Sequence, residues 1–264
     1  MKIIVLSDNQ SDNPQLLAEH GLSVLLETPR SRILLDTGAS DVFMRNASCL
    51  GIDITHVDVV FISHGHNDHA GGLRYFMKIN QKAKVIVSPD ALKGVFFSKR
   101  NLPHSITPQW PDDLHDRVIA VEKTYEVDGG LRVLTQIPQI YPLPRGNKHL
   151  YVQDAAGNLV PDDFRHELAL YADGLLFTGC AHSGLENILA ACPWPIHTVV
   201  GGFHLLDGLE SDEELTLMAQ RLIDQYPHTQ FYTSHCTGCQ AFQTMKRVMG
   251  ERLQAFSCGM QIQC

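Results

Sequence analysis

The sequence predicts an α/β fold, because strand-like apolar runs alternate with segments of helical periodicity. Residues 57–62 form a largely β-branched run that is typical of a fully buried strand. Residues 211–226 show the clearest helical pattern, with a capping box formed by Ser211 and Glu214 and with Pro227 after the end. A chain of 264 residues can bury a sizeable core as one large α/β domain or two small ones.

The first third of the chain predicts a sheet with helices between its strands. Strands are expected where short apolar runs are separated by polar or proline-containing turns, and helices where apolar residues recur on one face. The predicted strands cover residues 2–6, 22–27, 33–35, 57–62 and 84–87, and the predicted helices cover residues 41–50 and 73–79.

Residues 90–150 differ in character, with many prolines and weak periodicity. We interpret this stretch as an insertion, or lid, beside the core, because long loops of this kind are usually functional or mobile. Regular patterning then returns. The predicted elements are a hairpin of residues 168–171 and 174–178 joined by Ala172-Asp173, and strands at residues 197–200 and 230–233.

The overall composition argues against several classes of function. The formal net charge is −8 and no basic run is present, so we expect no nucleic-acid partner. No stretch approaches the roughly 18 consecutive apolar residues of a membrane span. The first seven residues are too poor in apolar side chains for a signal peptide, which predicts a cytoplasmic protein. Seven cysteines, an odd number, favour free thiols over a disulfide framework.

The strongest chemical signal is the run Ser-His-Gly-His-Asn-Asp-His-Ala-Gly-Gly at residues 63–72, directly after the buried strand. It brings together the imidazoles of His64, His66 and His69 and the carboxylate of Asp68, which are ligands that zinc and related divalent ions prefer. His64 and His66 can point the same way from an extended loop, while Asp68 and His69 turn toward an adjacent position. The run therefore predicts a metal centre rather than a surface loop that is merely rich in histidine.

Through this run, the chain resembles the metallo-β-lactamase superfamily. Within it, the chain is similar to the branch of metal-dependent hydrolases related to the dihydropterin ribofuranosyl-aminobenzene phosphate synthase of methanopterin synthesis. The resemblance implies a four-layer αβ/βα sandwich with metals at one edge, formed by residues 1–264 as a single domain with the insertion at about 90–150. The supporting phrases lie at residues 19–23, 35–38, 178–184, 201–205 and 233–238.

The resemblance assigns roles to two residues outside the histidine run. Asp36 matches the aspartate of the family's Asp-Thr-Gly motif, which orients the histidine loop through hydrogen bonds without binding metal. An ordinary Asx turn is the alternative for Asp36. His235, which follows a strand after the last predicted helix, matches the final histidine ligand of the family.

The chain also departs from the family pattern. In most relatives a Gly-Asp ending supplies an aspartate that bridges both metals, whereas Gly179 is followed here by Cys180. Relatives place a further histidine ligand upstream, where residues 162–167 offer two aspartates, His166 and Glu167. His182 could supply the missing imidazole and Cys180 a bridging thiolate. A buried structural cysteine is the alternative for Cys180.

Two further features leave alternatives open. Cys236 and Cys239 have Cys-x-x-Cys spacing, which we interpret as reduced thiols, with a zinc knuckle or redox dithiol as the weaker reading. His204 follows Gly-Gly-Phe and either faces the substrate or packs locally.

These assignments predict a metal-dependent hydrolase with two zinc ions, for which iron or manganese are alternatives. A hydroxide generated at the metals would attack a small ester, thioester, lactone or phosphoester. Asp68 would position the proton of the nucleophile, and His204 would donate to the developing oxyanion. A transferase acting on a pterin or ribosyl-phosphate compound and a non-catalytic metal- or redox-sensing module are the alternatives. The expected ligands are His64, His66, Asp68, His69, Cys180, His182 and His235.

The expected partner is a small-molecule substrate. A phosphorylated substrate would require a basic pocket, which the predicted insertion could provide. Its basic candidates are Lys93, Lys99, Arg100, Arg145 and Lys148.

Overall fold

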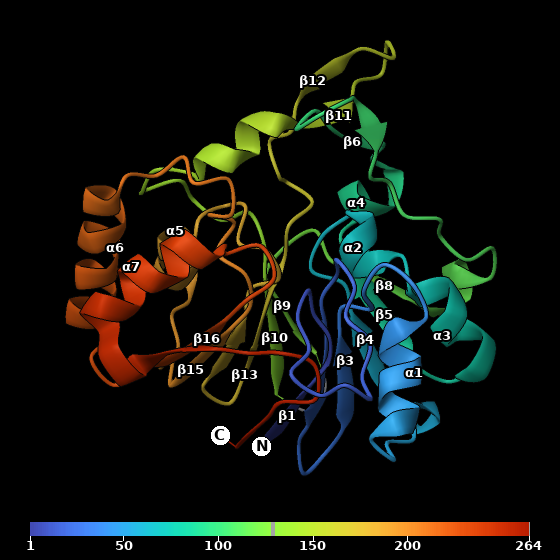
Figure 1. Ribbon diagram of the computed structural model, residues 1–264. Coiled ribbons are helices and arrows are strands. Elements are labelled where there is room, and N and C mark those ends of the chain that lie inside the picture. Colours follow the sequence, from blue (N-terminus) through green and yellow to red (C-terminus); the bar gives the residue numbers. More distant parts are fainter. Residues whose placement is uncertain (128–129, 264) are drawn as a thin grey trace.

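The computed structural model describes residues 1–127 and 130–263. Two seven-stranded sheets lie face to face, and helices cover the outer face of each sheet (Figure 1). The fold therefore has four layers in the order αβ/βα, which confirms the fold class that the sequence predicts.

The first sheet carries most of the N-terminal half of the chain. Its strands are β1 (Lys2–Ser7), β2 (Ser23–Glu27), β3 (Arg32–Leu35), β4 (Val59–Phe61), β5 (Lys84–Val87), β8 (Val118–Ala120) and β18 (Gln261–Gln263). Their order is β18-β1-β2-β3-β4-β5-β8. The strands from β18 to β3 are antiparallel, and those from β3 to β8 are parallel. Because β1 pairs with β18, the two ends of the described chain lie side by side (Figure 1).

The second sheet carries the C-terminal half. Its strands are β9 (Tyr125–Val127), β10 (Leu131–Leu134), β13 (Ala169–Ala172), β14 (Leu175–Phe177), β15 (Thr198–Val200), β16 (Gln230–Thr233) and β17 (Leu253–Ala255). Their order is β17-β16-β15-β14-β13-β10-β9. The strands from β14 to β17 are parallel, and the others are antiparallel.

The helices fall into two groups, one for each sheet. On the first side are α1 (Val42–Cys49), α2 (Asn67–Ala70), α3 (Leu73–Ile79) and α4 (Pro89–Lys93), and on the second α5 (Leu185–Ala191), α6 (Asp212–Gln225) and α7 (Cys239–Met249). Short 3-10 turns lie at η1 (Ile54–His56), η2 (Leu114–Arg117), η3 (Arg145–His149) and η4 (Gly250–Arg252). The predicted capping box begins α6: the Ser211 hydroxyl accepts from the Glu214 backbone N–H, and the Glu214 carboxylate accepts from that of Ser211. Among the described residues, none of the helices has the length and apolar character needed to cross a membrane.

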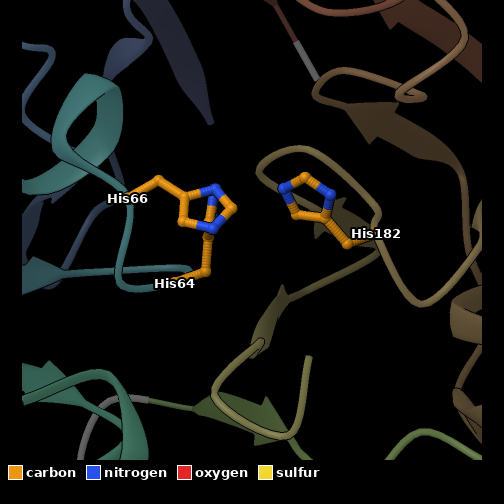
Figure 2. Close-up of side chains that lie close together, drawn as sticks. All are labelled: His64, His66 and His182. Carbon is orange, nitrogen blue, oxygen red and sulfur yellow. The ribbon is translucent and has the colours of Figure 1, made fainter. Parts of the chain in front are cut away.

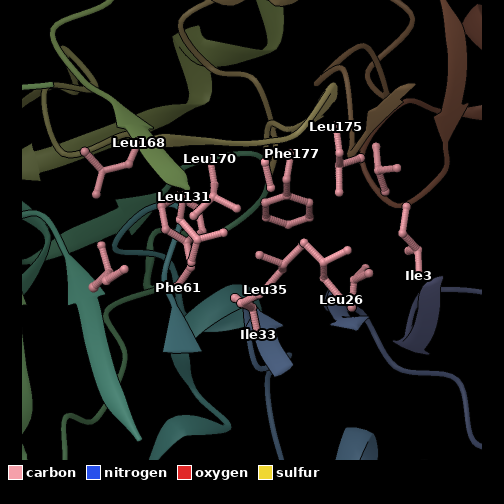
Figure 3. Packing of buried hydrophobic residues seen from close by; sticks show 14 of the residues in the cluster. Ile3, Leu26, Ile33, Leu35, Phe61, Leu131, Leu168, Leu170, Leu175 and Phe177 are labelled. Carbon is pink, nitrogen blue, oxygen red and sulfur yellow. The ribbon is translucent and has the colours of Figure 1, made fainter. Parts of the chain in front are cut away.

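The main core lies between the two sheets. Side chains of the first sheet, such as Leu35 and Phe61, face side chains of the second, such as Leu170 and Phe177 (Figure 3). The rings of Phe61 and Phe177 meet edge to face, with centroids 6.2 Å apart. Full burial of such a side chain contributes about 1.5–3 kcal/mol, so this layer holds the two sheets, and the site at their edge, in register.

A third, smaller sheet lies above one edge of the sandwich (Figure 1). It consists of β6 (Phe96–Ser98), β7 (His104–Ser105), β11 (Leu150–Gln153) and β12 (Leu159–Pro161), in the order β12-β11-β6-β7. The expected insertion at residues 90–150 is therefore only partly separate from the core. β8 belongs to the first large sheet, and β9 and β10 belong to the second.

The predicted hairpin forms, but its turn is shifted by one residue. The turn residues are Asp173 and Gly174, with φ of 44° and 89°, rather than Ala172 and Asp173. Two consecutive positive φ angles define the tight hairpin turn that matches strand twist, and an Asp-Gly pair adopts it more readily than Ala-Asp.

Candidate metal centre

The predicted site residues follow directly on strands whose carboxyl ends meet at one edge of the sandwich. β3 and β4 are parallel, as are β14, β15 and β16, so residues just beyond them converge. Crevices at the carboxyl ends of parallel strands are common ligand sites. The residues placed there are Asp36 after β3, the run 63–69 after β4, Cys180 and His182 after β14, His204 after β15 and His235 after β16.

His64, His66 and His182 form the first group of candidate ligands. A ring nitrogen of each lies within 4.8 Å of those of the other two, and all three side chains are buried. Figure 2 shows His64 and His66 from one loop facing His182 from another. Nε2 of each ring is buried and has no hydrogen-bond partner among the described residues. Buried polar atoms are normally paired, so three unpaired nitrogens this close together are suited to hold a divalent cation.

Hydrogen bonds explain why Nε2 is the free atom. Ser63 Oγ donates to Asp36 Oδ2 at 2.7 Å, so at 2.9 Å it accepts from Nδ1–H of His64. Nδ1 of His182 lies 3.2 Å from Oδ1 of Asn147, which can only accept. Nε2 of His64 and of His182 therefore presents a lone pair to the group.

The charge state fits a metal as well. Burial lowers the pKa of His64 and His182 well below the usual value, and it lowers the pKa of His66 to about 4. These imidazoles are therefore neutral, which is the form that binds metal. The donor set and its unpaired nitrogens fit a divalent cation.

Asp68, His69, His235 and Cys180 form a second group next to the first. Nε2 of His69 lies 3.1 Å from Nε2 of His235, and Oδ2 of Asp68 lies 3.7 Å and 3.4 Å from these two atoms. Sγ of Cys180 lies 3.1 Å from Nε2 of His69. Cys180 also falls within 4.8 Å of ring nitrogens of His64 and His182, so it lies between the two groups.

Outer hydrogen bonds orient the second group in the same way. Nδ1 of His69 donates to Oδ2 of Asp36 at 2.7 Å, and Nδ1 of His235 donates to Oδ1 of Asn9 at 2.9 Å. In the neutral rings both Nε2 lone pairs would then face each other, an arrangement that a shared cation would stabilise. Burial opposes a positive charge on His235, but the hydrogen bond to Asp68 and the charges of Cys236, Asp68 and Asp8 together outweigh it and raise the pKa of His235 to about 9. A cation bound here would therefore displace the proton from Nε2 of His235.

Asp36 has the geometry that the resemblance implies for it. Its Oδ1 accepts from the backbone N–H of Ser63 at 2.7 Å, and its Oδ2 accepts from Ser63 Oγ and from His69. Asp36 therefore contacts the histidine loop and does not point a free oxygen into either group of candidate ligands.

The backbone is strained at this edge of the sandwich. Asp36, Ala181, His204 and His235 have φ of 55°, 58°, 52° and 50°, in the left-handed region that non-glycine residues seldom adopt. Each such residue costs on the order of 1–3 kcal/mol and persists only when its surroundings fix it, a pattern typical of functional sites.

Cys236 is buried beside Cys180 and His235, with ligand atoms of all three within 4.8 Å of one another. A Cβ at Gly202 would lie 2.3 Å from Sγ of Cys236, so position 202 has no room for a residue larger than glycine. Cys239 is exposed, and both it and Cys236 are free thiols. Burial raises the pKa of Cys180 well above its usual value, so a thiolate there requires a neighbouring cation.

The residues upstream of β14 support the loops through hydrogen bonds, although ligand atoms of Asp162 and His166 also lie within 4.8 Å of His66. The backbone N–H of Gly65 donates to Nδ1 of His166 at 3.1 Å, and Nε2–H of His166 donates to Asp162 at 3.0 Å, so both ring nitrogens are occupied. Glu167 accepts from the backbone N–H groups of His182 and Ser183, each at 2.7 Å.

Several residues of the site have no role in the sequence-based prediction. Asn9 and Asn147 orient ligand rings from segments far away in the chain, and no local pattern marks them. His20 is exposed, stacks on His235 with centroids 5.2 Å apart, and places Nε2 3.4 Å from Asp68. Only its place in the motif at residues 19–23 could have drawn attention to it.

A cavity of about 370 Å³ opens beside both groups. Of the five basic residues that could have formed a phosphate pocket, Arg100 is the one among its lining residues. Arg145 instead lines a different cavity and pairs with Glu214, and Lys99 lies over the ring of Tyr151 at 3.7 Å. The residues that line the cavity of about 370 Å³ are His20, Ala39, His66, Asn67, Asp68, Ser98, Arg100, Asn101, His104, Ser105, Ile106, Leu150, Cys180, His182, His204, Leu206 and Cys236.

Comparisons with known proteins identify the family to which this fold belongs. Residues 17–155 match the model of the metallo-beta-lactamase superfamily. The crystal structure of Tm1679, described as a metal-dependent hydrolase of the beta-lactamase superfamily, is 30% identical, covers 100% of this chain and 99% of its own, and superposes with a TM-score of 0.84.

Two curated relatives come from Methanocaldococcus jannaschii. An uncharacterized protein is 29% identical over 93% of this chain and 94% of its own length. A 7,8-dihydropterin-6-methyl-4-(beta-D-ribofuranosyl)-aminobenzene-5'-phosphate synthase is 26% identical over 91% of this chain and 89% of its own length.

Proposed function

This chain belongs to the metallo-beta-lactamase superfamily, and we propose that it is a metal-dependent hydrolase of a small ester, thioester, lactone or phosphoester. The observation that carries the proposal is the set of buried, unpaired Nε2 atoms of His64, His66 and His182 beside a second donor group. A cavity of about 370 Å³ adjoins both groups and is within the size range of small-molecule sites.

Two ion positions follow from the two groups. His64, His66 and His182 would hold one ion, and Asp68, His69 and His235 the other. Cys180 lies within reach of both groups and would bridge them. Two divalent ions, which we propose to be zinc with iron or manganese as alternatives, would lower the pKa of water to about 7 and neutralise charge on the substrate oxygen.

The side chains of the chain supply orientation and proton control. Burial opposes a charge on Asp68, but His69 and His235 hold the pKa of its carboxyl well below the usual range, so it is a carboxylate. That carboxylate lies at the cavity, where it would accept a hydrogen bond from the attacking water and orient it. His204, on the opposite loop, would donate a hydrogen bond to the oxyanion or leaving group.

A transferase acting on a pterin or ribosyl-phosphate compound is the second candidate. The observation in its favour is the relative named as a 7,8-dihydropterin-6-methyl-4-(beta-D-ribofuranosyl)-aminobenzene-5'-phosphate synthase, which aligns with 91% of this chain. Arg100 at the cavity is compatible with an anionic substrate, but its partner Asp207 offsets its charge.

The test is a panel of esters, thioesters, lactones, phosphomonoesters and phosphodiesters, assayed with zinc-loaded and chelator-treated protein. We expect turnover of one class by the loaded protein, loss of that turnover on chelation, and its return when zinc is restored. Release of both hydrolysis products without an added acceptor distinguishes hydrolase from transferase. Equal rates for loaded and chelated protein, or turnover that depends on an acceptor, would contradict the hydrolase proposal.

A further inference from the structure

His204 is held by a donor that fixes which of its nitrogens carries the hydrogen. Nη2 of Arg100 lies 3.3 Å from Nε2 of His204. A guanidinium group has five N–H donors and no acceptor, so Nε2 of His204 must accept. In the neutral ring, the hydrogen of His204 is therefore on Nδ1.

The other face of the ring lies against the metal centre. Nδ1 of His204 is buried and has no hydrogen-bond partner of good geometry among the described residues. Ligand atoms of His204, His182 and Cys180 lie within 4.8 Å of one another, and the rings of His182 and His204 have centroids 4.1 Å apart. By position alone, His204 could be a metal ligand. In that tautomer Nδ1 carries a hydrogen and has no lone pair for a metal, so His204 would act there as a donor.

Arg100 is itself fixed by a carboxylate. Its Nε donates to Oδ1 of Asp207 at 2.9 Å, and its Nη2 donates to Oδ2 of Asp207 at 3.0 Å. Paired hydrogen bonds of this kind fix the plane of the guanidinium group as well as its position. Arg100 lies in the segment between β6 and β7, and Asp207 lies in the loop that also carries His204, so the pair joins these two segments beside the cavity.

The packing around this pair leaves little freedom. A Cβ at Gly146 would lie 2.7 Å from Oδ2 of Asp207 and 3.3 Å from Nε2 of His204. The hydrogen-bonded side chains of Asp207, Arg100 and His204 are thus packed closely against η3. His204 also has a φ of 52°, which it keeps only because its surroundings hold it there.

We propose that Asp207 and Arg100 are positioning residues that fix His204 as the Nδ1–H tautomer, which keeps it out of metal coordination and presents Nδ1–H to the oxyanion of the substrate. The donor role rests on the proposed hydrolase function, whereas the tautomer does not. Arg100 would then serve the reaction through His204 rather than by binding an anionic substrate group.

The decisive experiment is a long-range ¹H–¹⁵N correlation spectrum of metal-free protein labelled in its histidines. We expect the His204 signals, assigned by their loss in His204→Gln, to show the Nδ1–H tautomer. Arg100→Met keeps the length of the side chain but cannot donate, and it should release His204 to the Nε2–H form or to a mixture. Arg100→Lys keeps a donor and should preserve the Nδ1–H form. Arg165→Met removes an exposed arginine that pairs with Asp163 and is the matched control, which should leave the His204 signals unchanged.

An Nε2–H tautomer in the parent, or the same Nδ1–H tautomer in Arg100→Met, would overturn the proposal. Circular dichroism shows whether Arg100→Met keeps the parent fold. If it does not, Asp207→Asn serves as the second variant, and we expect it to lose the Nδ1–H tautomer of His204 in the same way. With a substrate in hand, Arg100→Met should lower kcat by about 10²-fold with little change in KM, and Arg100→Lys should recover part of it. Unchanged kcat would overturn the donor role. Because the spectrum needs neither metal nor substrate, failure to find any hydrolysis would contradict the proposed function and leave the tautomer assignment standing.

Discussion

Asp36 and His69 form a hydrogen bond of 2.7 Å between two fully buried side chains. The bond gives Nδ1 of His69 its acceptor and so directs the Nε2 lone pair into the second ligand group. We expect Asp36→Asn to weaken metal binding by about 10–100-fold. An amide NH2 group in place of Oδ2 would face the Nδ1–H of His69, and two donors cannot pair. The ring would then favour the tautomer with its hydrogen on Nε2, which has no lone pair there for a metal. Competition with a chelator measures the affinity. Asp58→Asn, which changes a carboxylate outside the site, is the control. Equal affinities for the parent and Asp36→Asn would contradict the role of Asp36.

His182 and His166 give a sharp contrast, since both are buried histidines close to His66. Nε2 of His182 is unpaired, whereas both nitrogens of His166 are hydrogen-bonded. We therefore expect His182→Gln to lose one of two bound ions and His166→Gln to retain both. Elemental analysis after supplementation with zinc gives the metal content. If His166→Gln loses metal as fully as His182→Gln, the assignment of the first position is wrong.

Cys180 is tested by two substitutions with opposite expectations. If its thiolate bridges the two ions, Cys180→Ser should lower the occupancy of one position, and Cys180→Asp should restore it by returning the carboxylate of the usual family pattern. In the cobalt-loaded parent, we expect a sulfur-to-cobalt charge-transfer band that both variants lack. Full metal content in Cys180→Ser, together with no such band in the parent, would make Cys180 a structural residue.

Asp68 separates catalysis from mere metal binding. Asp68→Asn keeps the size of the side chain and one oxygen, but it removes the charge beside the attacking water. We expect folding and much of the metal to remain while kcat falls at least about 10²-fold, the usual contribution of acid–base catalysis. The comparison is made at matched metal occupancy on the substrate that the panel identifies. Equal kcat in the two proteins would refute the mechanism even though the fold assignment would stand.

Phe177 tests the layer that holds the two sheets together. Phe177 is fully buried and contacts Phe61. We expect Phe177→Ala to lower the free energy of unfolding by about 3–5 kcal/mol, because it removes a large side chain from a closed core. Leu217→Ala, at a position that is 52% exposed, should change it by less than about 0.5 kcal/mol. Urea unfolding of the metal-free proteins avoids a contribution from bound ions. A loss in Phe177→Ala no larger than that of Leu217→Ala would contradict this account of the core.

The sequence is most informative where structure is local. The histidine run is continuous, so His64, His66, Asp68 and His69 can be assigned from spacing, and the strand ahead of them places the run at a sheet edge. Helix α6 is equally clear, since its capping box and apolar face lie within one segment.

The parts that were missed depend on distant contacts. Asn9 and Asn147 reach the ligand rings through folding and have no neighbouring motif. Arg100 stands out only as one of several basic residues, and its partner Asp207 is 107 positions away. The strands β8, β9 and β10 lie within residues 90–150, a stretch that we interpret as a whole from its prolines and weak periodicity, so their apolar runs are not separated from it.

The hydrogen bond between Asn9 and His235 joins residues 226 positions apart in the chain. During synthesis, the ribosome must therefore produce nearly all of the described residues before the second ligand group can close. The histidine run emerges much earlier and could capture a metal ion with an incomplete set of ligands. Contacts of such long range also slow folding, because a large loop must close before they form. The supply of metal to a nascent chain, and not only to the finished protein, should then influence how much correctly loaded protein a cell produces.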